Sequence, residues 1–466
     1  MAASAQVLYG GRSPPAPFMP LMRSAFAVPI CAWLVLCAPA VWAQGDTDSS
    51  APSTEEPLTL ERAVSLAAEQ NETARAAGAR AEAAEARVAK ARAFFLPRLS
   101  VSGTYTRRPQ ELTREVGGET VVVQRANALG ASVAARVPLL DARGFPLYQA
   151  AARDQEATAL DAREARRQVA FQAANAFLST LGQLQVADAA ERRLALARQS
   201  LEDARARATA GLASTNDVTR AELDVATAEA TLAEAVGQAE TSRLELGYLL
   251  VTPTRGPLAP PETLLGEASR PVDAFAGLEQ GALERRPDLL SARLRVEQQR
   301  ALAREPLARL FPALSASAQY TFNNESGLSG RTGNGFLALE LSWTLFDGGE
   351  RYADRHERLA LARALEWETV ARERRVDVAV ESARVSLRTA QASFARGEVA
   401  VRAARQNAEE TSILYRQGLA SSLALSDAQV SQYEAEVSLA QARYALGRAL
   451  LELRAAVGLD PLGKEP

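Results

Sequence analysis

The sequence contains very little sulfur, histidine or aromatic side chain. Its 466 residues include two cysteines, three methionines and one histidine, and aromatic residues make up 6% of the chain. Both cysteines, Cys31 and Cys37, and all three methionines lie within residues 1–43. The rest of the chain therefore has no thiol to form a disulfide, hold a metal or attack a substrate. His356 stands among charged neighbours without a companion ligand, so the pattern indicates no enzyme, cofactor or metal centre.

Residues 1–43 have the pattern of a cleavable signal peptide. Arg23 precedes an apolar run, Ala25–Val35, and small residues then suit cleavage before Gln44. The run is shorter than the roughly 20 residues that span a bilayer, which disfavours the alternative of a transmembrane anchor. The sequence therefore predicts an exported protein.

Three further features of the N-terminal region bear on processing. Met22 stands directly before Arg23 and offers an alternative start for the leader. Leu36 before Cys37 is a poor match to a lipoprotein signal, which disfavours a lipid anchor. Removing residues 1–43 takes away two arginines and no acid, so the net charge moves from −3 to −5 and no nucleic-acid partner is indicated. The polar segment 44–57 is expected to be a disordered lead-in.

The remaining chain repeats itself once. Three short segments return in the same order at offsets of 215, 206 and 207 residues: Phe95–Ser100 as Leu310–Ser315, Val137–Asp141 as Trp343–Asp347, and Ala210–Ser214 as Gln417–Ser421. This spacing indicates a tandem duplication rather than a short-period solenoid. We assign a first repeat to residues 58–256, a linker to 257–273, a second repeat to 274–459 and a tail to 460–466.

Long helices are expected in both copies. No proline occurs between Pro146 and Pro253, and the sequence there is rich in alanine and charged residues. A helix of about 64 residues would be roughly 95 Å long, more than a compact domain needs. A soluble fibrous coiled coil would share this pattern, so helices alone do not decide the class. The expected helices are 60–94, 145–209 and 215–249 in the first copy and 287–309, 352–416 and 422–457 in the second.

Four short segments alternate between apolar and polar residues. In Leu337–Leu345 every odd position is a large apolar residue, whereas the even positions are Ala, Glu, Ser and Thr. Such alternation over about ten residues is typical of transmembrane β-strands, with lipid on one side and water on the other. An amphipathic hairpin on a soluble core is the alternative. The expected strands are 99–106, 129–140, 314–322 and 336–346.

Four strands are too few to close a barrel, which needs about eight. An open edge in lipid would leave backbone groups unpaired, so the chain must oligomerise. Three copies would supply twelve strands, with polar side chains such as Arg136 and Glu340 lining a water-filled bore. The expected fold class is therefore an α+β membrane protein, whose protomer joins a trimeric barrel to a long coiled-coil tunnel.

From about Leu58 to Leu459 the chain resembles the TolC-type outer-membrane efflux protein family. The resemblance rests on the duplicated layout, on the Leu-Pro-x-Leu-Ser entry to each copy's first strand, and on Leu345–Gly349 and Glu284–Leu289. It implies a homotrimer in the outer-membrane lipid, with a tunnel that extends through the periplasm. The two Gly-Leu-Ala-Ser turns would form the periplasmic tips, where an adaptor protein docks, although they are also simply good turns. These tip residues are Gly211, Leu212, Ala213, Ser214, Gly418, Leu419, Ala420 and Ser421.

The resemblance also implies a periplasmic gate. Tyr415 matches a tyrosine that ties the helical coils together, and Asp217 matches an acid that holds neighbouring coils. Of two constriction positions, the first is Ala424 and only the second, Asp427, keeps an acid. A ring of Asp427 carboxylates would favour cations. Asp427 as an ordinary solvated helix residue remains the alternative.

Function follows from this resemblance. The chain is expected to conduct cargo passively from an inner-membrane transporter and a periplasmic adaptor to the outside, and the cargo is drugs, small molecules or metals. The segment Arg285–Leu289 favours a proton-driven drug or metal pump over an ATP-driven exporter. The alternatives are a type I protein-secretion channel and an exported coiled-coil scaffold.

Overall fold

The computed structural model describes residues 57–275, 277, 281–325 and 331–465. The chain divides into two units, Met1–Ser53 and Thr54–Pro466, and every described residue belongs to the second. The expected signal peptide and all but the last residue of the expected lead-in 44–57 therefore lie outside the described residues.

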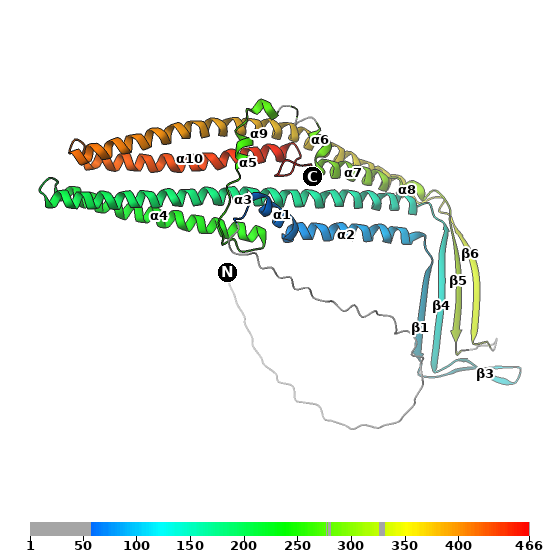
Figure 1. Cartoon of the computed structure of the whole chain (residues 1–466). Helices are drawn as coiled ribbons and strands as arrows, with labels where there is room; N and C mark the ends of the chain where they lie inside the picture. The colour runs from blue at the N-terminus through cyan, green and yellow to red at the C-terminus, as the bar shows by residue number, and fades with distance from the viewer. Residues whose placement is uncertain (1–56, 276, 278–280, 326–330, 466) are drawn as a thin grey trace, which may run out of the picture. The chain divides into compact units, whose positions relative to one another are not determined.

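One long helix organises the first copy. α3 (Gly144–Thr209) follows α1 (Leu60–Gln70), α2 (Glu72–Arg92) and a 3₁₀ turn, and it precedes α4 (Thr215–Leu250). Its 66 residues correspond to about 100 Å at about 1.5 Å per residue. α1 and α2 lie along one half of α3 and α4 along the other (Figure 1).

The expected continuous helix 60–94 is wrong, because the chain breaks at Asn71. This residue is extended (φ −62°, ψ 133°), and its side chain accepts a hydrogen bond from the amide of Thr73. The same side chain donates to the carbonyl of Leu249 in α4 at 3.2 Å. Asn71 thus ends α1, begins α2 and ties the break to a distant helix. Neither proline nor glycine marks this position, so the break depends on a tertiary contact.

The second copy repeats the plan around α9 (Glu350–Gln417), with α10 (Ser422–Ala456) along one half (Figure 1). Along the other half lie α7 (Pro287–Leu302) and α8 (Glu305–Ala308), preceded by α6 (Ala282–Arg285). The expected single helix 287–309 is therefore interrupted. Pro306 lacks the N–H that would continue the helical hydrogen bonds, which explains the break. Among the described residues, no helix is both long enough and apolar enough to cross a membrane.

Residues 257–273, expected as a linker, contribute to the core. α5 (Glu262–Ala268) buries Leu264 and Leu265, and Leu258 forms a parallel bridge with Leu58. The amide of Leu58 donates to the carbonyl of Pro257 at 2.9 Å. The segment between the copies is thus held against the start of the first repeat.

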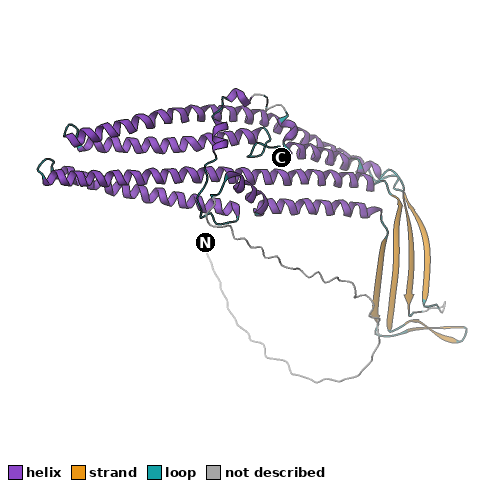
Figure 2. Cartoon of the chain, viewed as in Figure 1, coloured by secondary structure: helices purple, strands orange, loops and turns teal. Residues whose placement is uncertain are grey.

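Four antiparallel strands form one sheet in the order β1–β4–β5–β6. β1 (Arg98–Arg107) and β4 (Asn127–Leu140) come from the first copy, and β5 (Ala313–Asn323) and β6 (Gly333–Ser342) from the second. The central β4–β5 pair therefore joins the two copies, and Figure 2 shows these strands gathered apart from the helices. Within the described part of the chain, the outer edges of β1 and β6 have no strand partner.

The sheet has one apolar and one polar face. Leu99, Val101, Leu337, Leu339 and Leu341 share the apolar face, and their exposed fractions are 65–80%. Across the polar face, the hydroxyls of Ser102 and Ser132 lie 2.8 Å apart. Monomeric soluble proteins rarely leave so large an apolar surface uncovered. The expected alternative of a hairpin packed on a soluble core does not describe this protomer, because no described element covers the apolar face.

Two features of the strands differ from expectation. β6 ends at Ser342 rather than near residue 346, because its ladder partner Ala313 is preceded by Pro312, which has no N–H to donate. Between β1 and β4 the chain forms two strands that were not expected, β2 (Leu112–Val116) and β3 (Glu119–Gln124), which pair as a hairpin.

The largest buried cluster lies where α1, α5 and α10 pack on the middle of α3. Phe177, Leu178 and Tyr444 are fully buried there. Gly182 and Gly447 permit the close approach, because a Cβ at 182 would lie 3.4 Å from the Tyr444 ring and one at 447 would lie 3.1 Å from Leu178. This cluster fixes the bases of the two helical hairpins, α3/α4 and α9/α10, against each other.

Candidate functional site

The free ends of the two helical hairpins are built alike. Gly211 and Gly418 each follow the end of a long helix. Their φ angles of 71° and 79° lie in the left-handed region, which glycine adopts without a steric penalty. Ser214 and Ser421 then cap α4 and α10 through their hydroxyls. Leu212 and Leu419, with exposed fractions of 72% and 73%, project from the turns. The sequence motif thus produces two rigid turns that each present an apolar side chain.

The two tips are connected by direct contacts. Ser422 at the start of α10 donates to the carboxylate of Asp217 in α4 at 2.5 Å. Arg207 in α3 donates to the carbonyl of Tyr415 in α9 and stacks its guanidinium 4.7 Å from the centre of the Tyr415 ring. We call Arg207, Asp217, Tyr415 and Ser422 the tip latch. It holds the α3/α4 hairpin to the α9/α10 hairpin within one chain.

Electrostatics favours the ionised form of Asp217. Hydrogen bonds from the Ser422 hydroxyl and then from Ser214 hold the pKa of Asp217 below its ordinary value. Because the pKa is lowered in the latched state, the contribution of Asp217 is complete at neutral pH and is lost only as the pH falls through that lowered value. Burial raises the pKa of Tyr415, which therefore stays neutral beside Arg207.

The structure keeps the two expected constriction positions outside the tip latch. Ala424 and Asp427 are exposed on α10, whereas the residue that follows each of them, Leu425 and Ala428, is buried. The Asp427 carboxylate makes no hydrogen bond or ion pair with another described residue. Asp217 forms a capping box with Ser214, whereas the matching position in the second copy is Ala424.

A second set of contacts joins the hairpins farther from the tips. Glu436 in α10 accepts hydrogen bonds from Arg192 in α3 and Arg405 in α9, both at 2.9 Å. Arg193 stacks 5.1 Å from the centre of the Tyr433 ring. Burial alone would raise the pKa of Glu436, but these arginines and Gln432 outweigh it and keep the pKa below its ordinary value. The carboxylate therefore serves as an ionised clasp among three helices.

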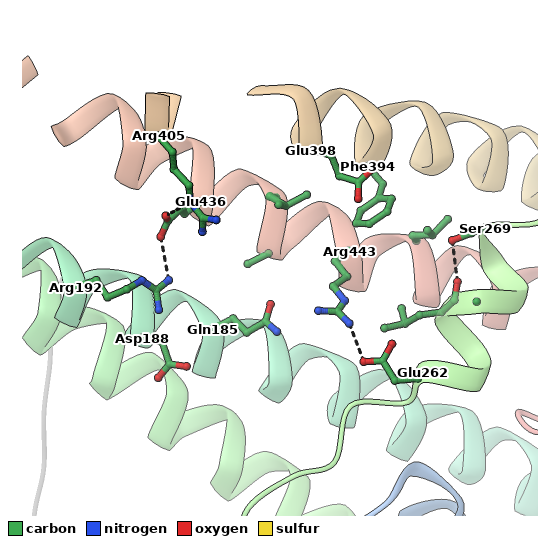
Figure 3. Close-up of a pocket in the computed structure, with 15 residues that line it drawn as sticks. Gln185, Asp188, Arg192, Glu262, Ser269, Phe394, Glu398, Arg405, Glu436 and Arg443 are labelled. Atoms are coloured by element: carbon green, nitrogen blue, oxygen red, sulfur yellow. Dashed lines mark hydrogen bonds and ion pairs between the residues drawn. The ribbon is translucent and has the colours of Figure 1, made fainter. Parts of the chain in front are cut away.

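The Glu436 clasp lies at one end of a cavity of about 590 Å³ between α3, α5, α9 and α10 (Figure 3). At the other end, Arg443 pairs with Glu262 at 2.9 Å. The charged side chains that line the cavity are largely paired with one another. No group of three or more metal-binding side chains occurs among the described residues. His356 lies exposed on α9. The cavity therefore has the properties of a solvated gap between helices.

The polar face of the sheet carries the two expected bore residues. Arg136 in β4 donates to Glu340 in β6 at 3.0 Å and to the Ser315 hydroxyl in β5 at 3.2 Å. Both charged side chains remain well exposed in the protomer. The structure thus brings Arg136 and Glu340 together across an intervening strand, a contact that the sequence did not predict, and their place in a bore stays a prediction.

Sequence reasoning missed Arg207, Arg192, Arg405 and Glu436. On alanine-rich helices these residues resemble an ordinary solvated face. The duplication offers one signal, since the position 207 residues after Arg207 is Leu414.

Comparison with known proteins agrees with this architecture. The family model described as outer membrane efflux protein matches residues 63–250 and 278–459. Among curated proteins, none matches the chain. Similar solved structures include a membrane protein from Pseudomonas aeruginosa, with 22% identity and a TM-score of 0.72, covering 86% of this chain and 90% of that one.

Two further similar structures are outer-membrane proteins of pathogens. The open state of the Neisseria gonorrhoeae MtrE outer membrane channel has 20% identity and a TM-score of 0.70, covering 86% of this chain and 89% of that one. VceC from Vibrio cholerae has 18% identity and a TM-score of 0.69, covering 86% and 96%. At these identities the structural likeness establishes the fold.

The family match defines the class as an outer membrane efflux protein rather than an enzyme. The chain belongs to the outer membrane efflux protein family, with both of its copies matched.

Proposed function

We propose that three copies of this chain form a channel and tunnel through which cargo passes from an inner-membrane pump and a periplasmic adaptor to the outside. The four-stranded sheet supports the proposal most strongly. Its apolar face is exposed, its opposite face is polar, and its two outer edges are unpaired among the described residues. Closing such edges in lipid requires more strands than one chain provides. Three protomers would supply twelve.

The helical tips support a role in docking and gating. Leu212 and Leu419 project from rigid turns, so six such turns in a trimer would offer an apolar ring to an adaptor. At the tips themselves the latch consists of a few side chains, so an adaptor that competes for these contacts would separate the tips, while the Glu436 clasp and the buried cluster still join the hairpins farther along. The channel itself would need no energy source. The Arg285–Leu289 segment favours a proton-driven drug or metal pump as the partner, and export requires the leader in residues 1–43.

Conductance of the purified chain in a planar bilayer tests this proposal. We expect discrete channel openings with a preference for cations, because a ring of three Asp427 carboxylates would repel anions. Replacing Asp427 by alanine should weaken that preference about twofold or more, as judged from the reversal potential in a salt gradient. The matched control is Asp224→Ala on α4, a half-buried acid of the first copy.

Each outcome has a distinct meaning. Openings with an unchanged reversal potential in Asp427→Ala would leave the channel proposal standing and remove Asp427 from the gate. A folded protein that inserts into lipid without conducting would contradict the channel itself.

A further inference from the structure

Two arginines face each other at the helical end of the sheet. Arg98 begins β1, and the antiparallel register places it directly opposite Arg136 in β4. Directly paired residues point to the same face, here the polar one. Like charges in this relation destabilise a sheet. Glu340 compensates the charge of Arg136, but the side chain of Arg98 makes no hydrogen bond or ion pair with another described residue.

The Arg98 side chain lines a cavity that is rich in positive charge. The cavity has a volume of about 350 Å³ and lies where the sheet meets the helices. Its charged lining consists of Arg98, Arg136, Arg143, Asp141 and Glu340. Asp141 accepts two hydrogen bonds from the Arg143 guanidinium, at 2.9 and 2.6 Å. Three guanidiniums and two carboxylates leave the lining of this cavity with one positive charge in excess.

The excess does not depend on how the ion pairs are shared. In a trimer, Arg98 on the edge strand β1 faces the edge strand β6 of a neighbouring copy, which carries Glu340. If Arg98 took Glu340 from that neighbour, an Arg136 would lose its partner instead. Three copies therefore carry three surplus positive charges around the bore at this level, whichever arginine holds each carboxylate.

We propose that this arginine ring is an anion-binding site for cargo that bears carboxylate or phosphate groups. The inference rests on the proposed trimeric channel. A guanidinium presents a planar fork of donors that matches a carboxylate or phosphate, and arginine rings select anions in pores. Phe94 lines the same cavity and offers an apolar contact beside the charge. The site therefore fits an amphipathic anion better than a small inorganic one.

The arginine ring and the tips would then act in series along the channel, with opposite charge preferences. The exposed Asp427 carboxylates at the tips favour cations, whereas the arginine ring at the sheet favours anions. A cargo that carries both charges, such as a zwitterion, would meet a favourable group at each end.

Citrate block of the channel current tests the proposal. Citrate added on the barrel side of wild-type channels in a bilayer should reduce the current, and Arg98→Gln should raise the half-blocking concentration about tenfold. Arg98→Lys keeps the charge without the fork, so the selectivity of its channels should stay close to wild type while citrate block weakens. Arg107→Gln, at the far end of the same strand, is the matched control and should behave as wild type. Inorganic phosphate, tested in parallel, should block less than citrate.

The outcomes separate this inference from the proposed function. Channels that open normally but show equal citrate block in wild type and Arg98→Gln would overturn the anion site alone. Weaker trimers in Arg98→Gln with unchanged block would mean that Arg98 only bridges neighbouring copies, which also overturns it. Because citrate block is first measured on wild-type channels, its absence there contradicts the site even if a variant fails to insert.

Discussion

Replacing Arg207 by alanine is expected to open the periplasmic tips. The substitution removes the stacking on Tyr415 and the hydrogen bond to its carbonyl. A cation–π contact contributes about 0.5–2 kcal/mol, and a hydrogen bond from a charged group about 1.5–3 kcal/mol. Allowing for partial exposure, a loss of about 2–3 kcal/mol would shift the balance between closed and open tips roughly 30- to 150-fold. The measurement is the fraction of time that single channels spend open in a planar bilayer.

A covalent link across the tip latch should reverse this effect. Because both native cysteines lie in residues 1–43, cysteines introduced at positions 217 and 422 can be joined without competing thiols in the remaining chain. In the Arg207→Ala background, oxidation or a short bifunctional thiol reagent should return the channel to its closed state, and reduction of the disulfide should reopen it. Such reversal would identify separation of the two hairpins as the opening movement.

The control for the link uses a pair within one hairpin. Arg205 in α3 and Glu222 in α4 belong to the same hairpin, and the Arg205 guanidinium lies 2.7 Å from the Glu222 carboxylate. Cysteines at these positions, joined by a bifunctional thiol reagent long enough to span the two helices, should leave opening unchanged, because α3 and α4 are expected to move together. If the 205–222 link closes the channel as well as the 217–422 link does, separation of the hairpins is not the movement that opens it.

Patterns that depend on local chemistry could be predicted from the sequence. Alternation of apolar and polar residues located all four strands of the main sheet, and the absence of proline after Pro146 predicted α3. The family match confirms the resemblance seen in the motifs. The helix break at Asn71 could not be predicted, because it depends on a hydrogen bond to Leu249, 178 positions away.

The contacts at the tips were predicted only in part, for a related reason, and their role as a gate stays a prediction. Tyr415 and Asp217 do lie in the tip latch, yet they are joined to the opposite hairpin by Arg207 and Ser422 rather than to each other. A polar residue on a long helix has the same local pattern whether it faces water or a second helix. The roles of Ala424 and Asp427 stay predictions, since both are exposed in the single chain.

For the tips to separate while the protein stays folded, the helices must remain packed at the other end of the bundle. A buried ion pair in α3 contributes to this packing. The Arg167 guanidinium donates to both carboxylate oxygens of Glu164, at 2.8 and 2.9 Å. The same guanidinium donates to the carbonyl of Ala455 in the last turn of α10, at 3.1 Å, and to that of Leu459 just beyond the helix, at 3.2 Å. The side chains of Arg167 and Glu164 are 6% and 10% exposed. The pair therefore ties the end of the second copy to the long helix of the first.

Replacing Glu164 by glutamine is expected to destabilise the helical bundle by about 3 kcal/mol. The change keeps the size of the side chain but leaves the Arg167 charge buried without its anion, and breaking such a pair typically costs about 3–5 kcal/mol. Glu222→Gln removes the same charge from an exposed pair with Arg205, where the loss should stay below about 1 kcal/mol. The denaturant midpoint for loss of helical circular dichroism measures both. Equal midpoints for the two variants would contradict the anchoring role. Only the buried pair should lose much stability when its carboxylate is neutralised, because Arg167 is then left charged and out of contact with water.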